Sequence, residues 1–205
     1  MPARKPGSVN PSYNRVRDPA PMRRAVALLL LLLPLAACAP GAGLPKLPPA
    51  PSGPYRLGAG DKLRLLTVAD PALDGDFRIS GAGDIELPLL GRFHAAGFTA
   101  SGLARALEYA LKAAGLERAP SVAVEVLRYR PVFVLGEVRK PGAFPYQPGM
   151  TVLSAVALAG GFTYRAIKDR AEVVRPRHGR PEAALARRAS PLLPGDVVTI
   201  FERRF

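Results

Sequence analysis

Few side chains in this 205-residue chain could carry metal or redox chemistry. There is one cysteine, Cys38, and there are two histidines, His94 and His178, which lie far apart in the sequence. A zinc site needs several thiolate, imidazole or carboxylate ligands at short spacing, and a disulfide needs a second cysteine. The sequence therefore predicts neither a metal site nor an internal disulfide.

Two Gly-x-Gly sequences, at 58–60 and 81–83, invite comparison with a phosphate-binding loop. A dinucleotide loop leads from a strand into a helix and carries a third glycine. Here the first sequence precedes a predicted strand, and the second lies between two predicted strands. We therefore expect no nucleotide and no other cofactor.

The catalytic possibilities are similarly weak. Asp74 and Asp76 flank Gly75 and could form a carboxylate pair, but their place on a loop before Phe77 favours turn and solvent roles. Serine hydroxyls are available, yet neither histidine lies in a motif that would activate one. We expect no catalytic residue and no enzymatic activity.

The N-terminal part looks like an export signal. Arg23-Arg24 precede thirteen mostly apolar residues, 25–37, which end at Cys38. As a helix this run would span about 20 Å, less than the ~30 Å hydrocarbon core of a membrane. The sequence Leu35-Ala-Ala-Cys38 resembles the bacterial lipobox, in which the cysteine becomes the lipidated first residue of the mature protein. An ordinary secretory signal with a chance cysteine is the alternative.

Composition divides the rest of the chain into further segments. Residues 1–21 are polar and aperiodic, and we interpret them as a disordered extension or a misassigned start that precedes a signal peptide at 22–37. Residues 38–54 are rich in proline and glycine, which predicts a flexible tether. Two folded units are expected to follow, at 55–130 and 131–205.

The first folded unit is predicted to contain strands and one helix. A strand is expected at 62–68, followed by a hairpin of two short strands around the turn at 81–84. Thr99 is a good N-cap for a helix whose leucines recur every four residues and which ends at Gly115. Alternating valines then predict a half-buried strand at 122–128.

The second folded unit is also predicted to contain both strands and a helix. Strands are expected at 132–138 and 144–147, a helix at 152–159, a strand pair around His178, and a last strand at 197–201. Strand pair, helix and strand pair in this order predict an α+β fold similar to a β-grasp.

Taken together, these stretches resemble the bacterial outer-membrane polysaccharide export family. Its export domain is similar to YRLGAGDKLRLLTV, GDIELPLLGRFHAAGFTASGLARALEYAL and PSVAVEVLRYRP. Its soluble-ligand-binding β-grasp (SLBB) domain is similar to VFVLGEVRKPGAFPYQPGMTVLSAVALAGGFTYRA and PGDVVTIFERRF. The resemblance covers about residues 55–205, and the ordered series of motifs carries it rather than any one of them.

The resemblance implies a lipoprotein that forms a homo-oligomeric ring and helps to carry capsular or exopolysaccharide to the cell surface. Its implied partners are an inner-membrane polysaccharide copolymerase, an acidic or neutral polysaccharide, and a separate outer-membrane β-barrel, since only one β-grasp unit and no spanning helix are seen. Ala39 after the cysteine favours a lipid anchor on the periplasmic side of the outer membrane. The alternative is a saccharide-binding or scaffold module that recruits the assembly complex.

Charge is concentrated in the C-terminal part. The whole chain has a formal charge of +13, and residues 128–205 carry fourteen Lys or Arg against six Asp or Glu. If subunits surround a lumen, these cations could contact polymer or a neighbouring subunit; ion pairs and a solvated surface are the alternative. An exported chain would not meet nucleic acid, so no nucleic-acid partner is expected. The basic candidates are Arg128, Arg130, Arg139, Lys140, Arg165, Lys168, Arg170, Arg175, Arg177 and Arg180.

The SLBB-like unit also contains glycines expected at turns, where they permit positive φ angles or close backbone approach. They are Gly136, Gly142, Gly149, Gly160 and Gly161.

Overall fold

Two separate hydrophobic cores organise the folded chain in this computed structural model. The structure describes residues 3, 40–68, 73–177 and 180–203, so Cys38 and the predicted signal peptide lie outside the described residues. Contacts divide the chain after Ala42, and residues 43–205 form one unit that contains both cores. Few helices and several sheets make up these cores, which confirms the predicted α+β class.

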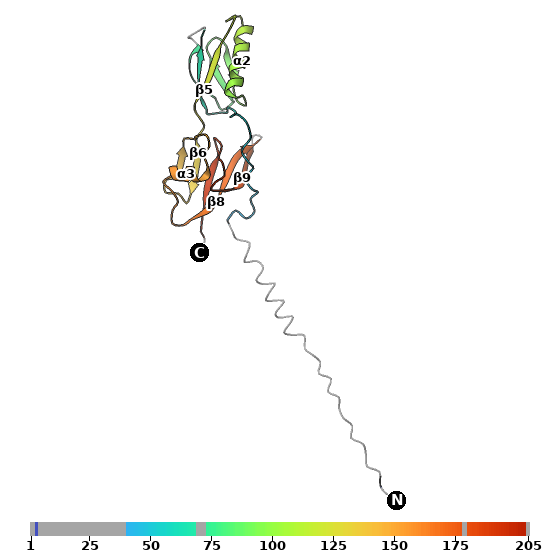
Figure 1. The fold of residues 1–205 in the computed structure, drawn as a ribbon, viewed down its shortest axis with the longest axis vertical. Coiled ribbons are helices and arrows are strands. Elements are labelled where there is room, and N and C mark those ends of the chain that lie inside the picture. The colour runs from blue at the N-terminus through green and yellow to red at the C-terminus, as the bar shows by residue number, and fades with distance from the viewer. Residues whose placement is uncertain (1–2, 4–39, 69–72, 178–179, 204–205) are drawn as a thin grey trace. The chain divides into compact units, whose positions relative to one another are not determined.

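The first core lies on a three-stranded antiparallel sheet in the order β2-β1-β5. The central strand is β1 (Lys62–Thr67), between β2 (Gly75–Arg78) and β5 (Val122–Arg128). Burial alternates along β1, so Leu63 and Leu65 face the core while Arg64 and Leu66 face solvent. Figure 1 shows the helix α2 alongside β5, where it covers the buried face of the sheet.

The helix α2 (Ala100–Ala113) follows the prediction closely. The hydroxyl of Thr99 accepts a hydrogen bond from the Gly102 amide at 3.0 Å, which satisfies one of the free amides of the first turn. Gly115 adopts a φ of 69° just past the end, as expected of a C-terminal glycine. The buried face is formed by Leu103, Leu107 and Leu111.

The predicted hairpin around residues 81–84 is wrong. Strand β2 pairs with β1, and β3 (Asp84–Leu87) pairs instead with a strand that was not predicted, β4 (Gly91–His94). The turn between β3 and β4 places Leu89 at a φ of 66°, a conformation that leucine rarely adopts. Pro88 and Gly91 are typical turn residues at this point, but the glycines at 81 and 83 give a competing signal, and the prediction placed the hairpin turn there.

The second core lies on a five-stranded mixed sheet in the order β7-β6-β10-β8-β9. Its C-terminal strand β10 (Val197–Glu202) occupies the centre, parallel to β6 (Val132–Gly136) and antiparallel to β8 (Ala166–Arg177). The edge strands are β7 (Gly142–Phe144) and β9 (Arg180–Arg187). Figure 1 shows β8 and β9, in orange and red, as neighbours in this sheet.

One short helix packs on this sheet. It is α3 (Val152–Leu158), which begins at a capping box formed by Thr151 and Ser154. Thr151 therefore caps the helix. The predicted return strand at 144–147 starts two residues earlier, and β6 ends at Gly136 rather than at 138. The predicted turn at His178-Gly179 lies outside the described residues.

Part of the predicted tether is bound to the second sheet. The amide of Leu47 donates to the Leu185 carbonyl at 2.8 Å, and the amide of Leu185 donates to the Pro45 carbonyl at 2.7 Å. These bonds place Lys46 beside the edge strand β9 in parallel orientation, and Leu47 packs against the second core. Residues 45–47 therefore cover an edge whose unpaired backbone groups could otherwise recruit another strand.

The glycines predicted for the second unit differ in how strictly they are required. Gly136 has a φ of 79°, and a Cβ atom there would lie 2.2 Å from the Ile200 carbonyl oxygen of β10. Gly149, Gly160 and Gly161 also adopt positive φ angles. Gly142, in contrast, has neither a positive φ nor any atom within 4 Å of a built Cβ.

We predict that Gly136→Ala destabilises the second core by more than about 2 kcal/mol, because the new methyl group combines a strained φ with a clash against the β10 backbone. Gly142→Ala is the matched control and should change the free energy of unfolding by less than about 0.5 kcal/mol. Urea unfolding of both variants measures the difference. Equal stability of the two variants would contradict the close approach of β6 and β10.

Candidate functional site

A buried carboxylate, Asp61, holds together the start and the end of the first folded unit. Asp61 is 0% exposed. Its Oδ2 accepts hydrogen bonds from the Tyr55 hydroxyl at 2.6 Å and the Gly58 amide at 2.8 Å. Its Oδ1 accepts one from the Arg130 amide at 2.9 Å and lies 3.5 Å from Arg130 Nε. The charge is thus met by a cation and three donors, as burial requires.

The glycines at 58 and 60 make room for the Arg130 side chain. A Cβ at Gly58 would lie 2.5 Å from Arg130 Nη1, and one at Gly60 would lie 3.3 Å from Arg130 Cγ. The Arg130 guanidinium also donates to the Tyr55 hydroxyl at 3.1 Å. This Gly-x-Gly sequence therefore accommodates the Arg130 side chain.

The second core contains the same arrangement. Asp196 is 0% exposed and forms a two-point ion pair with Arg175, Nε to Oδ1 at 2.9 Å and Nη2 to Oδ2 at 2.8 Å. The Leu193 amide donates to Asp196 Oδ2 at 2.8 Å, just as Gly58 does to Asp61. Arg175, one of the predicted polymer-contacting cations, is therefore only 6% exposed and has a structural partner.

Both aspartates end the same five-residue pattern, Leu-x-x-Gly-Asp, directly before a strand. The pattern covers residues 57–61 before β1 and 192–196 before β10, and both of its leucines are buried. In each case the glycine has a positive φ and the aspartate carboxylate turns back to an amide three residues earlier. The repeated pattern is the sequence signal that could have identified these two sites in advance.

Three tyrosines stack edge to face beside Arg130. The ring of Tyr129 lies 4.9 Å from that of Tyr55 and 5.6 Å from that of Tyr146, at interplanar angles of 82° and 76°. Such T-shaped pairs are favourable and fix the orientation of the rings. Burial, followed by the hydrogen bond to Asp61, raises the pKa of Tyr55 far above its usual value. Burial also raises the pKa of Tyr146, so both hydroxyls remain protonated donors near neutral pH.

Tyr55, Tyr146 and Arg130 border a cavity of about 570 Å³. Its walls come from parts of the segments 50–56, 146–149, 175–176 and 191–194, together with Arg130. Three arginines, two tyrosines and six prolines line it, and its described lining residues include no Asp or Glu. The cavity thus offers guanidinium and aromatic groups on rigid walls, whereas the carboxylates of Asp61 and Asp196 are buried away from its surface.

The other predicted basic residues lie at several places in the fold. Arg165 forms an ion pair with Glu202, and the partly buried Arg170 lies 3.7 Å from Asp169. The side chain of Arg177 lies outside the described part of the chain. The remaining members are exposed: Arg128, Arg139, Lys140, Lys168 and Arg180.

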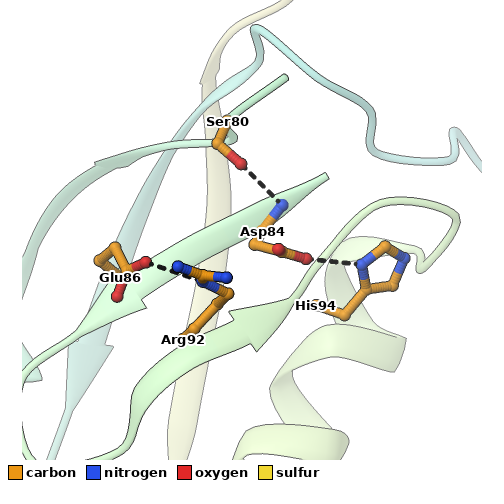
Figure 2. Close-up of polar contacts among 5 residues, drawn as sticks. All are labelled: Ser80, Asp84, Glu86, Arg92 and His94. Atoms are coloured by element: carbon orange, nitrogen blue, oxygen red, sulfur yellow. Dashed lines mark hydrogen bonds and ion pairs between the residues drawn. The ribbon is translucent and has the colours of Figure 1, made fainter. Parts of the chain in front are cut away.

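The β3–β4 hairpin carries a polar cluster that superficially resembles a catalytic triad. Figure 2 shows the Ser80 hydroxyl beside the Asp84 amide (3.1 Å) and the Asp84 carboxylate beside His94 Nδ1 (2.7 Å). No described hydrogen bond joins the serine to the histidine, so the hydroxyl is not activated by a base in this geometry. His94 instead pairs across the hairpin with Asp84, and Arg92 pairs in the same way with Glu86.

The possible carboxylate pair of Asp74 and Asp76 has structural partners. Asp74 accepts hydrogen bonds from the amide and the hydroxyl of Thr67. Asp76 forms ion pairs with Arg64 and Lys62 at 2.8 and 2.9 Å, and the hydrogen bond from Arg64 is the main cause that lowers its pKa. Both residues thus hold β1 against β2, in line with a structural interpretation.

Metal-binding clusters and membrane-spanning helices are both absent from the described residues. No three His, Cys, Asp or Glu side chains in this part of the chain come together in a way that could hold a metal ion. No helix among the described residues has the length and hydrophobicity needed to cross a membrane.

Comparison with known proteins places both cores in described families. Residues 49–127 match the family model for polysaccharide biosynthesis/export proteins, and residues 131–185 match the model for the SLBB domain. The chain is also 38% identical over 161 residues to the exopolysaccharide production protein ExoF of Rhizobium meliloti (strain 1021). That similarity covers 73% of this chain but only 37% of the relative.

We predict that Asp61→Asn lowers the free energy of unfolding by about 3 kcal/mol or more. The asparagine side chain is neutral, so Arg130 loses its counter-charge. Its NH₂ group also replaces an oxygen that accepts a hydrogen bond from the Tyr55 hydroxyl or the Arg130 amide, so two donors face each other. Asp76→Asn, which alters an exposed carboxylate, should change stability much less. Chemical denaturation of both variants tests this, and a mild effect of Asp61→Asn would contradict the network described here.

Proposed function

Because the chain belongs to the polysaccharide biosynthesis/export family, we propose that it is a non-enzymatic component of a machine that exports capsular or exopolysaccharide. In this proposal several copies form a ring through which, or along which, the polymer passes. In this proposal the chain supplies binding surfaces, and other proteins catalyse the synthesis of the polymer.

The observation that carries this proposal is the order of the two matched domains. An export domain is followed directly by an SLBB domain, and each has its own core on a separate sheet. The similar rhizobial protein is named for exopolysaccharide production, which points the same way. Since the chain spans only 37% of that relative, the activity of the whole relative is carried over here only as part of the proposal.

We further propose that Cys38 is lipidated and anchors the chain to the periplasmic side of the outer membrane. The apolar run 25–37 that ends at this cysteine supports the anchor. Two or more acyl chains would make the attachment stable, whereas a single chain holds only marginally. The proposed partners are other copies of this chain, an inner-membrane copolymerase and a separate outer-membrane pore protein.

A saccharide-binding or scaffold role without a conduit is the second candidate, and the 570 Å³ cavity lined by arginine and tyrosine favours it. Under this alternative the chain would recruit the assembly complex as a monomer or dimer.

Deletion of the gene is expected to abolish extracellular polysaccharide, and complementation with a chain that starts at Met22 should restore it. The measurement is the amount of polymer outside the cell and in the periplasm. Loss outside with accumulation inside is the result expected of an export component. Unchanged extracellular polymer in a strain without a second gene of this family would contradict the export role.

Replacing the lipid acceptor, Cys38→Ser, should release the protein from the outer-membrane fraction while the two cores stay folded, because residue 38 precedes the folded unit 43–205. Membrane fractionation with immunoblotting measures the release. Ala39→Ser serves as the matched control and should remain membrane-bound. A Cys38→Ser protein that still sediments with the outer membrane would show that the anchor lies elsewhere.

A further inference from the structure

We propose that the cavity beside Tyr55, Arg56 and Tyr146 binds a carboxylate-bearing sugar unit of the exported polymer. This inference rests on the proposed export function for the polymeric nature of its ligand. The preference for an acidic sugar, in contrast, comes from the charges and surfaces of the cavity itself.

The three arginines that line the cavity differ in whether a carboxylate neutralises them. Arg130 and Arg175 are held by Asp61 and Asp196, both of which are fully buried. The third arginine, Arg56, is exposed and donates to the neutral carbonyl of Gly97 at 2.7 Å. Its charge has no carboxylate partner among the described residues, so this corner of the cavity keeps one uncompensated cation.

A carboxylate is the complementary ligand group for that corner. Guanidinium groups bind carboxylates through two parallel, charge-assisted hydrogen bonds, which are stronger than neutral ones. The described cavity lining contains no Asp or Glu that would repel an anion. A neutral sugar could fill the same space but would leave the Arg56 charge unused.

The walls of the cavity are formed largely by tyrosine and proline side chains, which are apolar and rigid. Sugar rings have hydroxyl edges and C–H faces, and they suit surfaces that combine aromatic faces with hydrogen-bond donors. Tyr55 and Tyr146 supply aromatic faces, and their rings are fixed through the edge-to-face contacts with Tyr129. Tyr146 also supplies a hydroxyl, whereas the Tyr55 hydroxyl already donates to Asp61. Prolines add walls that lose little conformational freedom on binding.

The volume of the cavity also fits a small ligand. A volume of about 570 Å³ lies within the range of small-molecule sites in proteins, about 300–1,000 Å³. The site therefore suits a short segment of a polymer rather than a long stretch of it. If each contact is weak, successive polymer segments bind and dissociate as the polysaccharide moves past the cavity.

The test uses the full-length lipoprotein in detergent and two matched probes. One is a tetrasaccharide that contains glucuronate, and the other is the same tetrasaccharide with its carboxylates reduced to alcohols. Isothermal titration calorimetry should detect the acidic probe, with an affinity that falls as salt is added. The carboxyl-reduced probe should bind at least about tenfold more weakly, the loss expected for a charge-assisted hydrogen bond.

Variants locate the binding. Arg56→Gln should weaken binding of the acidic probe by about tenfold and have little effect on the reduced probe. Tyr146→Ala should weaken both probes. Arg105→Gln, which removes the same charge from the exposed face of α2, is the matched control and should leave both affinities unchanged.

Three outcomes would overturn the proposal: equal affinity for the two probes, equal weakening by Arg56→Gln and Arg105→Gln, or no binding of the acidic probe. Binding of anionic phospholipid vesicles that Arg56→Gln abolishes, without any saccharide binding, would assign the site to a membrane surface and also overturn it. The gene-deletion experiment stands apart from these measurements. Lost export in the deletion strain together with absent binding would reject the cavity and keep the export role.

Discussion

The fold of this chain depends on how it accommodates two buried negative charges. A carboxylate taken out of water is costly unless a cation and hydrogen-bond donors surround it. Asp61 and Asp196 meet this requirement in the same way, with an amide three residues earlier in the turn and an arginine from a distant segment. Each aspartate directly precedes a strand at the centre of its sheet, β1 or β10, so the turn, the strand and the arginine are fixed together.

This constraint also shapes the surface that we connect with function. Because the two aspartates lie behind their arginines, the guanidinium groups are held at the cavity wall while the carboxylates remain hidden. The tyrosines beside Arg130 are oriented by one another and by the same network. Residues that stabilise the fold thus also determine the chemistry of the cavity. The exposed Arg56 adds a third guanidinium, which has no carboxylate partner among the described residues.

Local signals in the sequence were sufficient where a structure is determined locally. The helix α2 and the cap at Thr151 follow from capping residues and from leucines at helical spacing, and both were predicted correctly. The pairing of β3 with β4 was missed because the glycines at 81 and 83 compete as a turn signal with Pro88 and Gly91, and because Leu89 takes a backbone conformation typical of glycine. The site was missed for a different reason: Asp61 and Arg130 are 69 residues apart, and nothing in either local sequence indicates their contact. Only the repetition of Leu-x-x-Gly-Asp before two strands hints that these aspartates share a role.

The central position of β10 has a consequence for how the protein is made. Strand β6 is complete at residue 136, yet its parallel neighbour begins only at residue 197. The second sheet therefore cannot close before residues 197–202 are available, whereas the first core is complete by residue 130. Pairings across so many residues slow folding because the intervening loop must be ordered first. The first core can therefore fold while the second sheet still lacks its central strand, and the second sheet closes last.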